Sequence, residues 1–121
     1  MGNYICIFYK TVSGNSPVED FIESLDEDTQ DKFIYKKELL EHFGPQLRCP
    51  HTSEISEGIF ELRFKGKEGQ IRILFFFYYE KQIILVHGFV KKTQKTPKKE
   101  INIAKKRKTE YYQRVKEEEK L

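Results

Sequence analysis

Cationic side chains lie in an arrangement suited to chemistry on a phosphate group. Arg72 interrupts an apolar segment, Arg63 lies in the alternating segment before it, and Lys91, Lys92 and Lys95 follow a third apolar segment. Guanidinium and ammonium groups donate charged hydrogen bonds to phosphate oxygens, and the planar guanidinium can donate two at once. If these segments are neighbouring strands, their alternation brings the side chains to one patch. We therefore take these five residues as candidate catalytic residues acting on a phosphodiester.

Arg72 has a second interpretation, which the residue types leave open. A charge buried in an apolar strand is costly unless it meets a partner, an open cleft or an anion. Glu61 or another carboxylate would supply such a partner and make Arg72 a structural residue. The functional interpretation is favoured by Arg63 on the neighbouring strand and by the lysine-rich segment after the third strand.

Basic and polar residues around this patch are candidates for contacts with a bound polynucleotide. We expect RNA-binding contacts from Lys65, Lys67, Thr93, Gln94, Lys98 and Lys99. The lysines between positions 105 and 108 lie on a predicted helix, where ordinary solvation is a sufficient explanation for them.

The chain lacks the sequence signatures of several reaction classes. No Ser-His-Asp order, nucleotide-binding loop or carboxylate metal cluster is recognisable, which argues against a covalent hydrolase, a P-loop enzyme and a metal-dependent nuclease. RNA carries its own nucleophile, the 2′-hydroxyl. A site needs only to align it, move its proton and stabilise the charged phosphorane. The sequence therefore predicts metal-free chemistry on RNA, with no cofactor.

His51 and His87 are the candidate proton carriers, because histidine titrates near neutral pH. His51 precedes the strands and would lie at the edge of the cleft, whereas His87 lies on the third strand and is more simply a packed strand residue. A lysine crowded by other cations would also serve, because its pKa falls. Lys91, Lys92 and Lys95 are crowded in this way, although phosphate binding without proton transfer is the simpler role for at least two of them.

Three consecutive strands must position the cationic residues. Residues 59–65 alternate between apolar and polar types, residues 70–78 are nearly continuous β-formers, and residues 83–90 are rich in β-branched types. The segments 66–69 and 80–81 are turn candidates, the first with a glycine at each end. These patterns predict an antiparallel meander.

The remaining elements frame this meander. We expect a strand over 4–9, a helix over 17–25 with a capping box at Ser16, and a second helix from about Asp26 to Phe43. Lys36 on the second helix looks solvent-facing, and residues 48–57 read as an irregular connector. Thr96 is the expected cap of a last helix, with Pro97 in its first turn. The predicted fold is α+β: a twisted, mostly antiparallel sheet of four or five strands, an N-terminal helical hairpin on one face and a C-terminal helix.

Composition and charge limit the class of protein. The 121 residues predict one domain over 1–121, with 38% hydrophobic and 14% aromatic residues. Residues 1–60 carry a net charge of −6 and residues 61–121 one of +9, so the second half has the character of a surface that faces a polyanion. Cys6 and Cys49 are expected to be free thiols in a reducing cytoplasm. No apolar run is long enough for a membrane span, and the N-terminus does not have the pattern of a signal peptide.

Several strings of residues together resemble a known family. Residues 60–63 read F-E-L-R, residues 72–76 read R-I-L-F-F, and residues 87–97 read H-G-F-V-K-K-T-Q-K-T-P. With Gly44-Pro45 and the order of the elements, they resemble the phage-derived HigB-like branch of the RelE/ParE toxin superfamily. The resemblance covers nearly the whole chain and implies a RelE-like fold.

The resemblance implies the toxin of a type II toxin–antitoxin pair. Such toxins are ribosome-dependent endoribonucleases that cut mRNA in the ribosomal A site without a metal. The implied partner is a cognate helix-turn-helix antitoxin, and operator DNA would be bound only through it. Arg72 matches the strand arginine that serves the scissile phosphate in the RelE group, Lys91 and Lys92 match the basic segment approximately, and Tyr111 and Tyr112 are counterparts for a C-terminal tyrosine. We expect the antitoxin to cover the surface of Arg63, Arg72 and Lys91.

Two other function classes remain open at this point. The ParE branch shares the fold but inhibits gyrase and cuts no RNA. A non-catalytic RNA-binding phage accessory protein would use the same basic surface. The convergence of Arg63, Arg72 and the lysine segment favours the nuclease.

Overall fold

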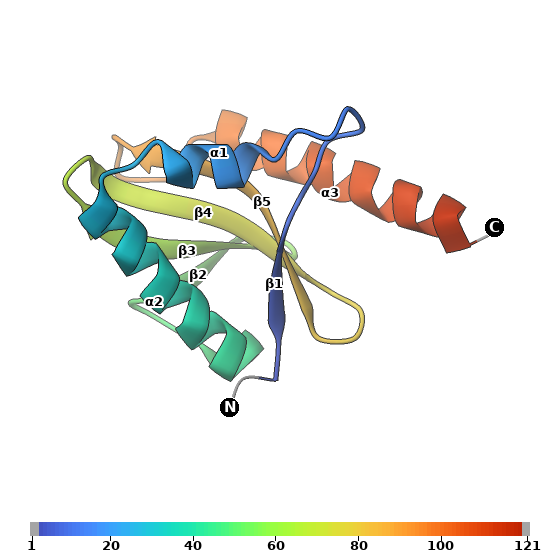
Figure 1. The fold of residues 1–121 in the computed structure, drawn as a ribbon, viewed down its shortest axis with the longest axis horizontal. Coiled ribbons are helices and arrows are strands. Elements are labelled where there is room, and N and C mark those ends of the chain that lie inside the picture. The colour runs from blue at the N-terminus through green and yellow to red at the C-terminus, as the bar shows by residue number, and fades with distance from the viewer. Residues whose placement is uncertain (1–2, 120–121) are drawn as a thin grey trace.

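The computed structural model describes residues 3–119 of the chain (Figure 1). The elements in chain order are β1 (Ile5–Phe8), α1 (Pro17–Glu23), α2 (Glu27–Phe43), the short 3₁₀ helix η1 (Gly44–Gln46), β2 (Thr52–Ser56), β3 (Ile59–Gly66), β4 (Gly69–Tyr78), β5 (Gln82–Lys91) and α3 (Lys98–Glu119). The predicted α+β class is confirmed.

The strands form one open sheet in the order β1-β5-β4-β3-β2. The meander of β3, β4 and β5 is antiparallel as predicted, and β1 joins the edge of β5 in parallel. The prediction of an irregular connector over 48–57 is wrong, because Thr52–Ser56 pairs with β3 as an antiparallel edge strand. This segment is polar and short. Its strand conformation depends on backbone pairing with β3, which local sequence does not reveal.

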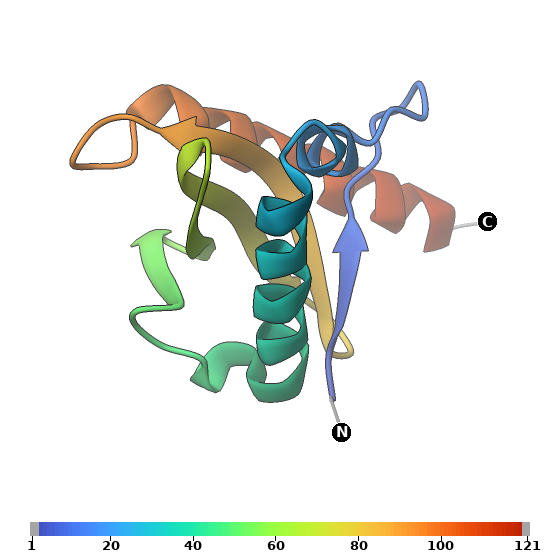
Figure 2. The same cartoon turned by 60° about the vertical axis from the view of Figure 1, so that its left-hand side comes forward.

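Helices cover both faces of the sheet (Figure 1, Figure 2). One face packs against α1 and α2, with Ile71, Ile73 and Phe75 of β4 in that layer. The other face packs against α3, with Leu74 and Phe76 of β4 in the second core. Since side chains alternate along a strand, Arg72 lies on the α3 face.

The expected N-terminal helical hairpin is not evident in the structure. Both helices lie on the same face of the sheet, but α1 packs mainly against β5 and α2 mainly against β3 (Figure 1). The turn between β3 and β4 docks at their junction. There, Glu68 accepts hydrogen bonds from the Asp26 backbone N–H at 2.6 Å and from Thr29 Oγ1 at 2.8 Å. Each helix is therefore oriented by the sheet rather than by the other helix.

Helix caps differ in part from the predicted ones. Asp26 caps α2 by accepting from the Asp28 backbone N–H at 3.1 Å. Ser16 precedes α1, but its side chain makes no capping hydrogen bond, so the predicted capping box is wrong. Pro17 occupies the first turn of that helix as expected, because its fixed φ suits this position.

The cysteines are free thiols. Burial, with a smaller contribution from Glu41, raises the pKa of Cys6 to about 12, so this thiol stays protonated near neutral pH. Among residues 3–119, no helix combines the length and the apolar character needed to cross a membrane.

Candidate active site

The register of β3 and β4 places Arg63 directly opposite Arg72. Opposed residues of an antiparallel pair have Cα atoms only about 4.5–5.5 Å apart, and their side chains share a face. Like charges at such a position repel each other. A compensating group or a bound anion is therefore needed at this point of the sheet.

Glu61 supplies part of that compensation. Its Oε1 lies 3.6 Å from Arg63 Nε and 3.5 Å from Arg72 Nε, and the residue is 3% exposed. The structural ion pair that was the alternative interpretation of Arg72 is thus present. Thr96 donates from Oγ1 to Glu61 Oε2 at 2.6 Å. The predicted cap role of Thr96 is wrong, because α3 begins at Lys98 and this hydroxyl ties the loop after β5 to Glu61.

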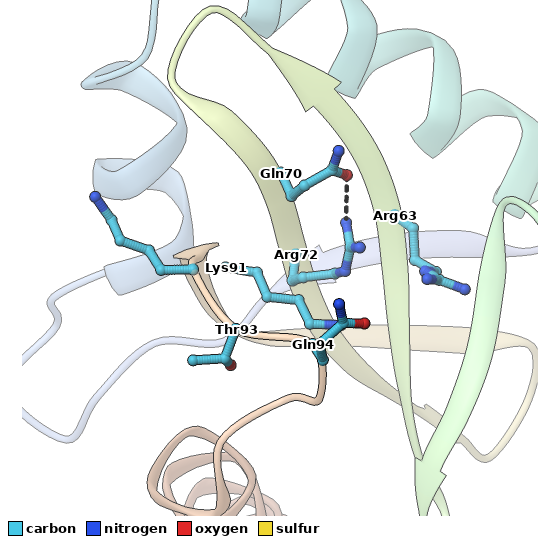
Figure 3. A pocket seen from close by; sticks show the side chains of 7 residues that line it. Arg63, Gln70, Arg72, Lys91, Thr93 and Gln94 are labelled. Atoms are coloured by element: carbon cyan, nitrogen blue, oxygen red, sulfur yellow. Dashed lines mark hydrogen bonds between the residues drawn. The ribbon is translucent and has the colours of Figure 1, made fainter.

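One carboxylate does not satisfy two guanidinium groups. Arg72 donates from one terminal nitrogen to the Ile71 carbonyl at 2.9 Å and to Gln70 Oε1 at 3.5 Å (Figure 3). The buried Nε atoms of Arg63 and Arg72 have no hydrogen-bond partner among the described residues. Burial lowers the pKa of Arg72, the Glu61 charge raises it and the Arg63 charge lowers it further. The cluster has more charged donors than acceptors, which is the electrostatic character of an anion site.

A pocket of about 570 Å³ opens over these arginines (Figure 3). It is lined by Arg63, Gln70, Arg72, Lys91, Lys92, Thr93 and Gln94, and we call it the arginine pocket. The strands contribute Arg63 from β3, Gln70 and Arg72 from β4 and Lys91 from β5, while the loop before α3 contributes the rest. The structure thus brings four of the five candidate catalytic residues together. Their catalytic roles stay predictions.

Lys95 lies next to the arginine pocket. It lines an adjoining cavity, the loop pocket, with Ser53, Ile55, Glu61, Arg63, Lys91, Thr96, Lys98 and Ile101. Of the candidate RNA-binding residues, Thr93 and Gln94 line the arginine pocket and Lys98 lines the loop pocket. Lys65, Lys67 and Lys99 are exposed and lie outside both cavities. Gln70 was missed by the sequence analysis, although its position two residues before Arg72 puts it on the same face.

The two histidines occupy different environments. His87 stacks on Phe89 with ring centroids 5.5 Å apart, and its Nε2 lies 2.7 Å from Glu100 Oε1 of α3. Burial lowers the pKa of His87, partly offset by the Glu100 contact. His87 is therefore a packed strand residue beneath the first turn of α3, which agrees with the simpler of its two interpretations.

His51 lies at the open edge of β3. Its carbonyl accepts the Arg63 backbone N–H at 2.8 Å, and its Nδ1 lies 2.7 Å from Lys36 Nζ. Burial lowers the pKa of His51, and the Lys36 charge lowers it further. Lys36 lines a cavity with Pro50, Arg63, Phe64, Gln70 and Arg72, which we call the edge pocket.

Lys36 is only partly exposed, so it faces solvent less fully than predicted. Burial lowers the pKa of its amine, because α2 packs against β3 and Lys36 lines the same cavity as the two arginines. Lys36 follows the buried Phe33 by three residues and precedes the buried Leu40 by four. This spacing places Lys36 on the same helix face as the apolar stripe, which indicates partial burial. The prediction of an exposed side chain followed instead from the residue type, because lysine is usually exposed.

Tyr111 and Tyr112 lie toward the other end of the sheet. Both rings contact Phe76 and Tyr78, at centroid distances between 5.1 and 5.8 Å. Phe76 is four residues beyond Arg72 on β4, which corresponds to about 13 Å of strand. These tyrosines are therefore not part of the arginine pocket.

Comparison with known proteins supports a specific family. The model of the phage-derived Gp49-like protein family (DUF891) matches residues 20–109, about three quarters of the chain. The matched segment contains every residue that lines the arginine, loop and edge pockets. A search of curated proteins found no match. The chain therefore belongs to the phage-derived Gp49-like family, which is part of the RelE/HigB-like toxin group.

Proposed function

We propose that this protein is the toxin of a type II toxin–antitoxin system, a HigB-like, ribosome-dependent endoribonuclease that cuts mRNA and so inhibits translation. The observation that carries the proposal is the opposed pair Arg63 and Arg72, which share one buried carboxylate and face a pocket rimmed by Lys91 and Lys92. Such a pair suits the extra negative charge of a phosphorane better than a singly charged ground state. Membership of a toxin group supports the same conclusion.

The proposed reaction needs no group beyond RNA and the protein's own side chains. The 2′-oxygen attacks the adjacent phosphorus, the P–O5′ bond breaks, and the products are a 2′,3′-cyclic phosphate and a 5′-hydroxyl. Arg72 stabilises the phosphorane, with Arg63 and Lys92 assisting. One proton leaves the 2′-hydroxyl and one reaches the departing 5′-oxygen, so a base and an acid are required.

Among the candidate proton carriers, His51 has the best position when it is taken together with Lys36. Lys36 lines the edge pocket, which shares Arg63, Gln70 and Arg72 with the arginine pocket. A charged Lys36 donates to Nδ1 of a neutral His51. When this hydrogen bond opens, His51 Nδ1 is the base that takes the proton of the 2′-hydroxyl, and the Lys36 ammonium is the acid that gives a proton to the departing 5′-oxygen. Lys91 and Lys95 then serve as phosphate-binding residues.

Replacing Lys36 with alanine is expected to lower single-turnover cleavage by at least about 10²-fold, the lower end of general acid–base catalysis. In the wild type, the folded pKa of His51 lies below its ordinary value of about 6.5, so the rate should be constant from pH 8 to about 6.5 and fall only below that. Loss of the Lys36 charge should move the acidic limb upward.

The adjacent Lys37, which pairs with Glu41 at 3.3 Å, provides the matched control for Lys36. Lys37→Ala should leave the rate and its pH profile unchanged. Wild-type rates and an unmoved acidic limb in Lys36→Ala would remove the Lys36–His51 pair from the mechanism.

The proposed function is tested by adding the purified protein to ribosomes programmed with a defined mRNA. We expect cleavage in the A site that yields a cyclic phosphate and a 5′-hydroxyl. Inhibition of gyrase supercoiling with intact mRNA would assign the protein to a ParE-like activity. Binding of RNA without cleavage would indicate a non-catalytic RNA-binding protein.

A cognate helix-turn-helix antitoxin is the partner that this function implies, with operator DNA bound only through it. The most direct way for the antitoxin to inhibit the toxin is to cover Arg63, Arg72 and Lys91 with acidic or apolar residues. Protection of these side chains from chemical modification in the co-expressed complex measures that contact.

A further inference from the structure

A groove leads away from the arginine pocket between β2 and α3. Its first part is the loop pocket, of about 440 Å³, which shares Arg63 and Lys91 with the arginine pocket. Ser53 and Ile55 of β2 form one wall, and Lys98 and Ile101 of α3 form part of the other. The groove therefore begins at the residues proposed to hold the scissile phosphate.

A further cavity of about 750 Å³ continues along the same two elements. It is lined by Ser56, Glu57, Gly58 and Ile59 of the β2–β3 hairpin and by Lys105, Lys108, Thr109, Tyr112 and Gln113 of α3. Positions 98, 101, 105, 108 and 112 are three or four residues apart, so they form a single stripe along the helix. The loop pocket and this cavity therefore follow one another along the same face of α3, and we call the two together the β2–α3 groove.

The chemistry of the groove combines cations with aromatic and apolar surface. Lys98 and Lys105 are exposed on its rim, and Tyr112 is 42% exposed. Lys108 Nζ lies 5.9 Å from the centre of the Tyr112 ring and 5.6 Å from that of Phe76. The carboxylates among the described lining residues are Glu57 and Glu61, and the second is held by the arginines.

We propose that the β2–α3 groove binds the single-stranded RNA that flanks the scissile phosphate, with its backbone on Lys98 and Lys105 and a base stacked on Tyr112. This inference rests on the proposed function, because a polynucleotide held at Arg63 and Arg72 must continue into an adjoining channel. Basic grooves with exposed aromatic rings suit single strands of any sequence.

The length of the groove sets the size of the bound segment. Lys98 and Tyr112 are fourteen residues apart on one helix, or about 21 Å at 1.5 Å per residue. At about 3.4 Å per stacked nucleotide this distance accommodates roughly six nucleotides. A short oligonucleotide confined to the arginine pocket would not reach Tyr112.

The test compares binding of 2′-O-methyl RNA oligonucleotides of three and ten nucleotides by fluorescence anisotropy. Methylation blocks the nucleophile, so binding is measured without cleavage. The wild type should bind the ten-mer more tightly than the trimer. Lys105→Ala and Tyr112→Ala should each weaken the ten-mer about tenfold and leave the trimer unchanged, whereas Tyr112→Phe, which keeps the ring, should bind normally.

Lys106→Ala is the matched control. Lys106 is exposed like its neighbour Lys105, but it lines a different cavity with Tyr9, Ile103, Arg107 and Glu110. Equal weakening by Lys105→Ala and Lys106→Ala, or equal binding of both oligonucleotides by the wild type, would overturn the groove assignment and leave the proposed function intact.

Two other outcomes separate the remaining possibilities. Failure to bind either oligonucleotide, combined with no cleavage on ribosomes, would count against the proposed function itself. Normal ten-mer binding by the groove variants, together with weakened binding of the antitoxin, would assign the groove to a protein partner and overturn the RNA assignment.

Discussion

Replacing Arg72 with lysine is expected to lower mRNA cleavage on programmed ribosomes by about 10²–10³-fold, the usual loss for one preorganised charge-stabilising donor. The lysine keeps a positive charge beside Glu61, so the buried ion pair at 3.5 Å retains its electrostatic balance. It does not reproduce the planar fork that donates to two oxygens at once. The variant therefore separates transition-state stabilisation from folding.

Alanine at position 72 is a less informative change, because Arg72 is 5% exposed and its removal leaves the Glu61 carboxylate with one arginine. Folding of Arg72→Lys is checked by circular dichroism, and Lys106→Ala serves as an active control. If a folded Arg72→Lys protein cuts at the wild-type rate, the role of Arg72 is only structural, in its ion pair with Glu61.

Replacing Glu61 with leucine is expected to lower the free energy of unfolding by about 3 kcal/mol, the lower end of the cost of breaking a buried ion pair. The change leaves two opposed guanidinium groups without their shared carboxylate and removes the acceptor of the Thr96 hydroxyl. Arg63, with a side chain 33% exposed, can turn toward water, whereas Arg72 is too deeply buried to do so. Urea denaturation measures the difference.

A double-mutant cycle isolates the pair. Glu61→Leu combined with Arg72→Met should recover most of the lost stability, because two apolar side chains of similar volume replace a buried ion pair at little net cost. Glu57→Ala, at an exposed position, should change stability by less than about 0.5 kcal/mol. If the losses from the two single variants simply add in the double variant, Glu61 and Arg72 are not coupled.

Part of the candidate site was already determined by the local sequence. Strand alternation has a period of two, and the tight turn between Gly66 and Gly69 sets the register of β3 against β4. Counting back from that turn places Arg63 opposite Arg72 and Lys65 opposite Gln70. Because β5 ends directly in a lysine-rich loop, Lys91 and Lys92 lie at the same pocket as the two arginines. These features follow from the order of neighbouring residues.

Other features were decided only by the tertiary structure. The pairing of Thr52–Ser56 with β3, the separate packing of α1 and α2, and the meeting of Lys36 with His51 join segments that carry no local signature of each other. The same holds for Thr96, whose hydroxyl had a suitable position as a helix cap but binds Glu61, thirty-five residues away. The physical reason is that a polar side chain or a short polar strand takes whichever partner the packed core brings near it. The identity of that partner depends on how the helices pack on the sheet, and not on sequence spacing.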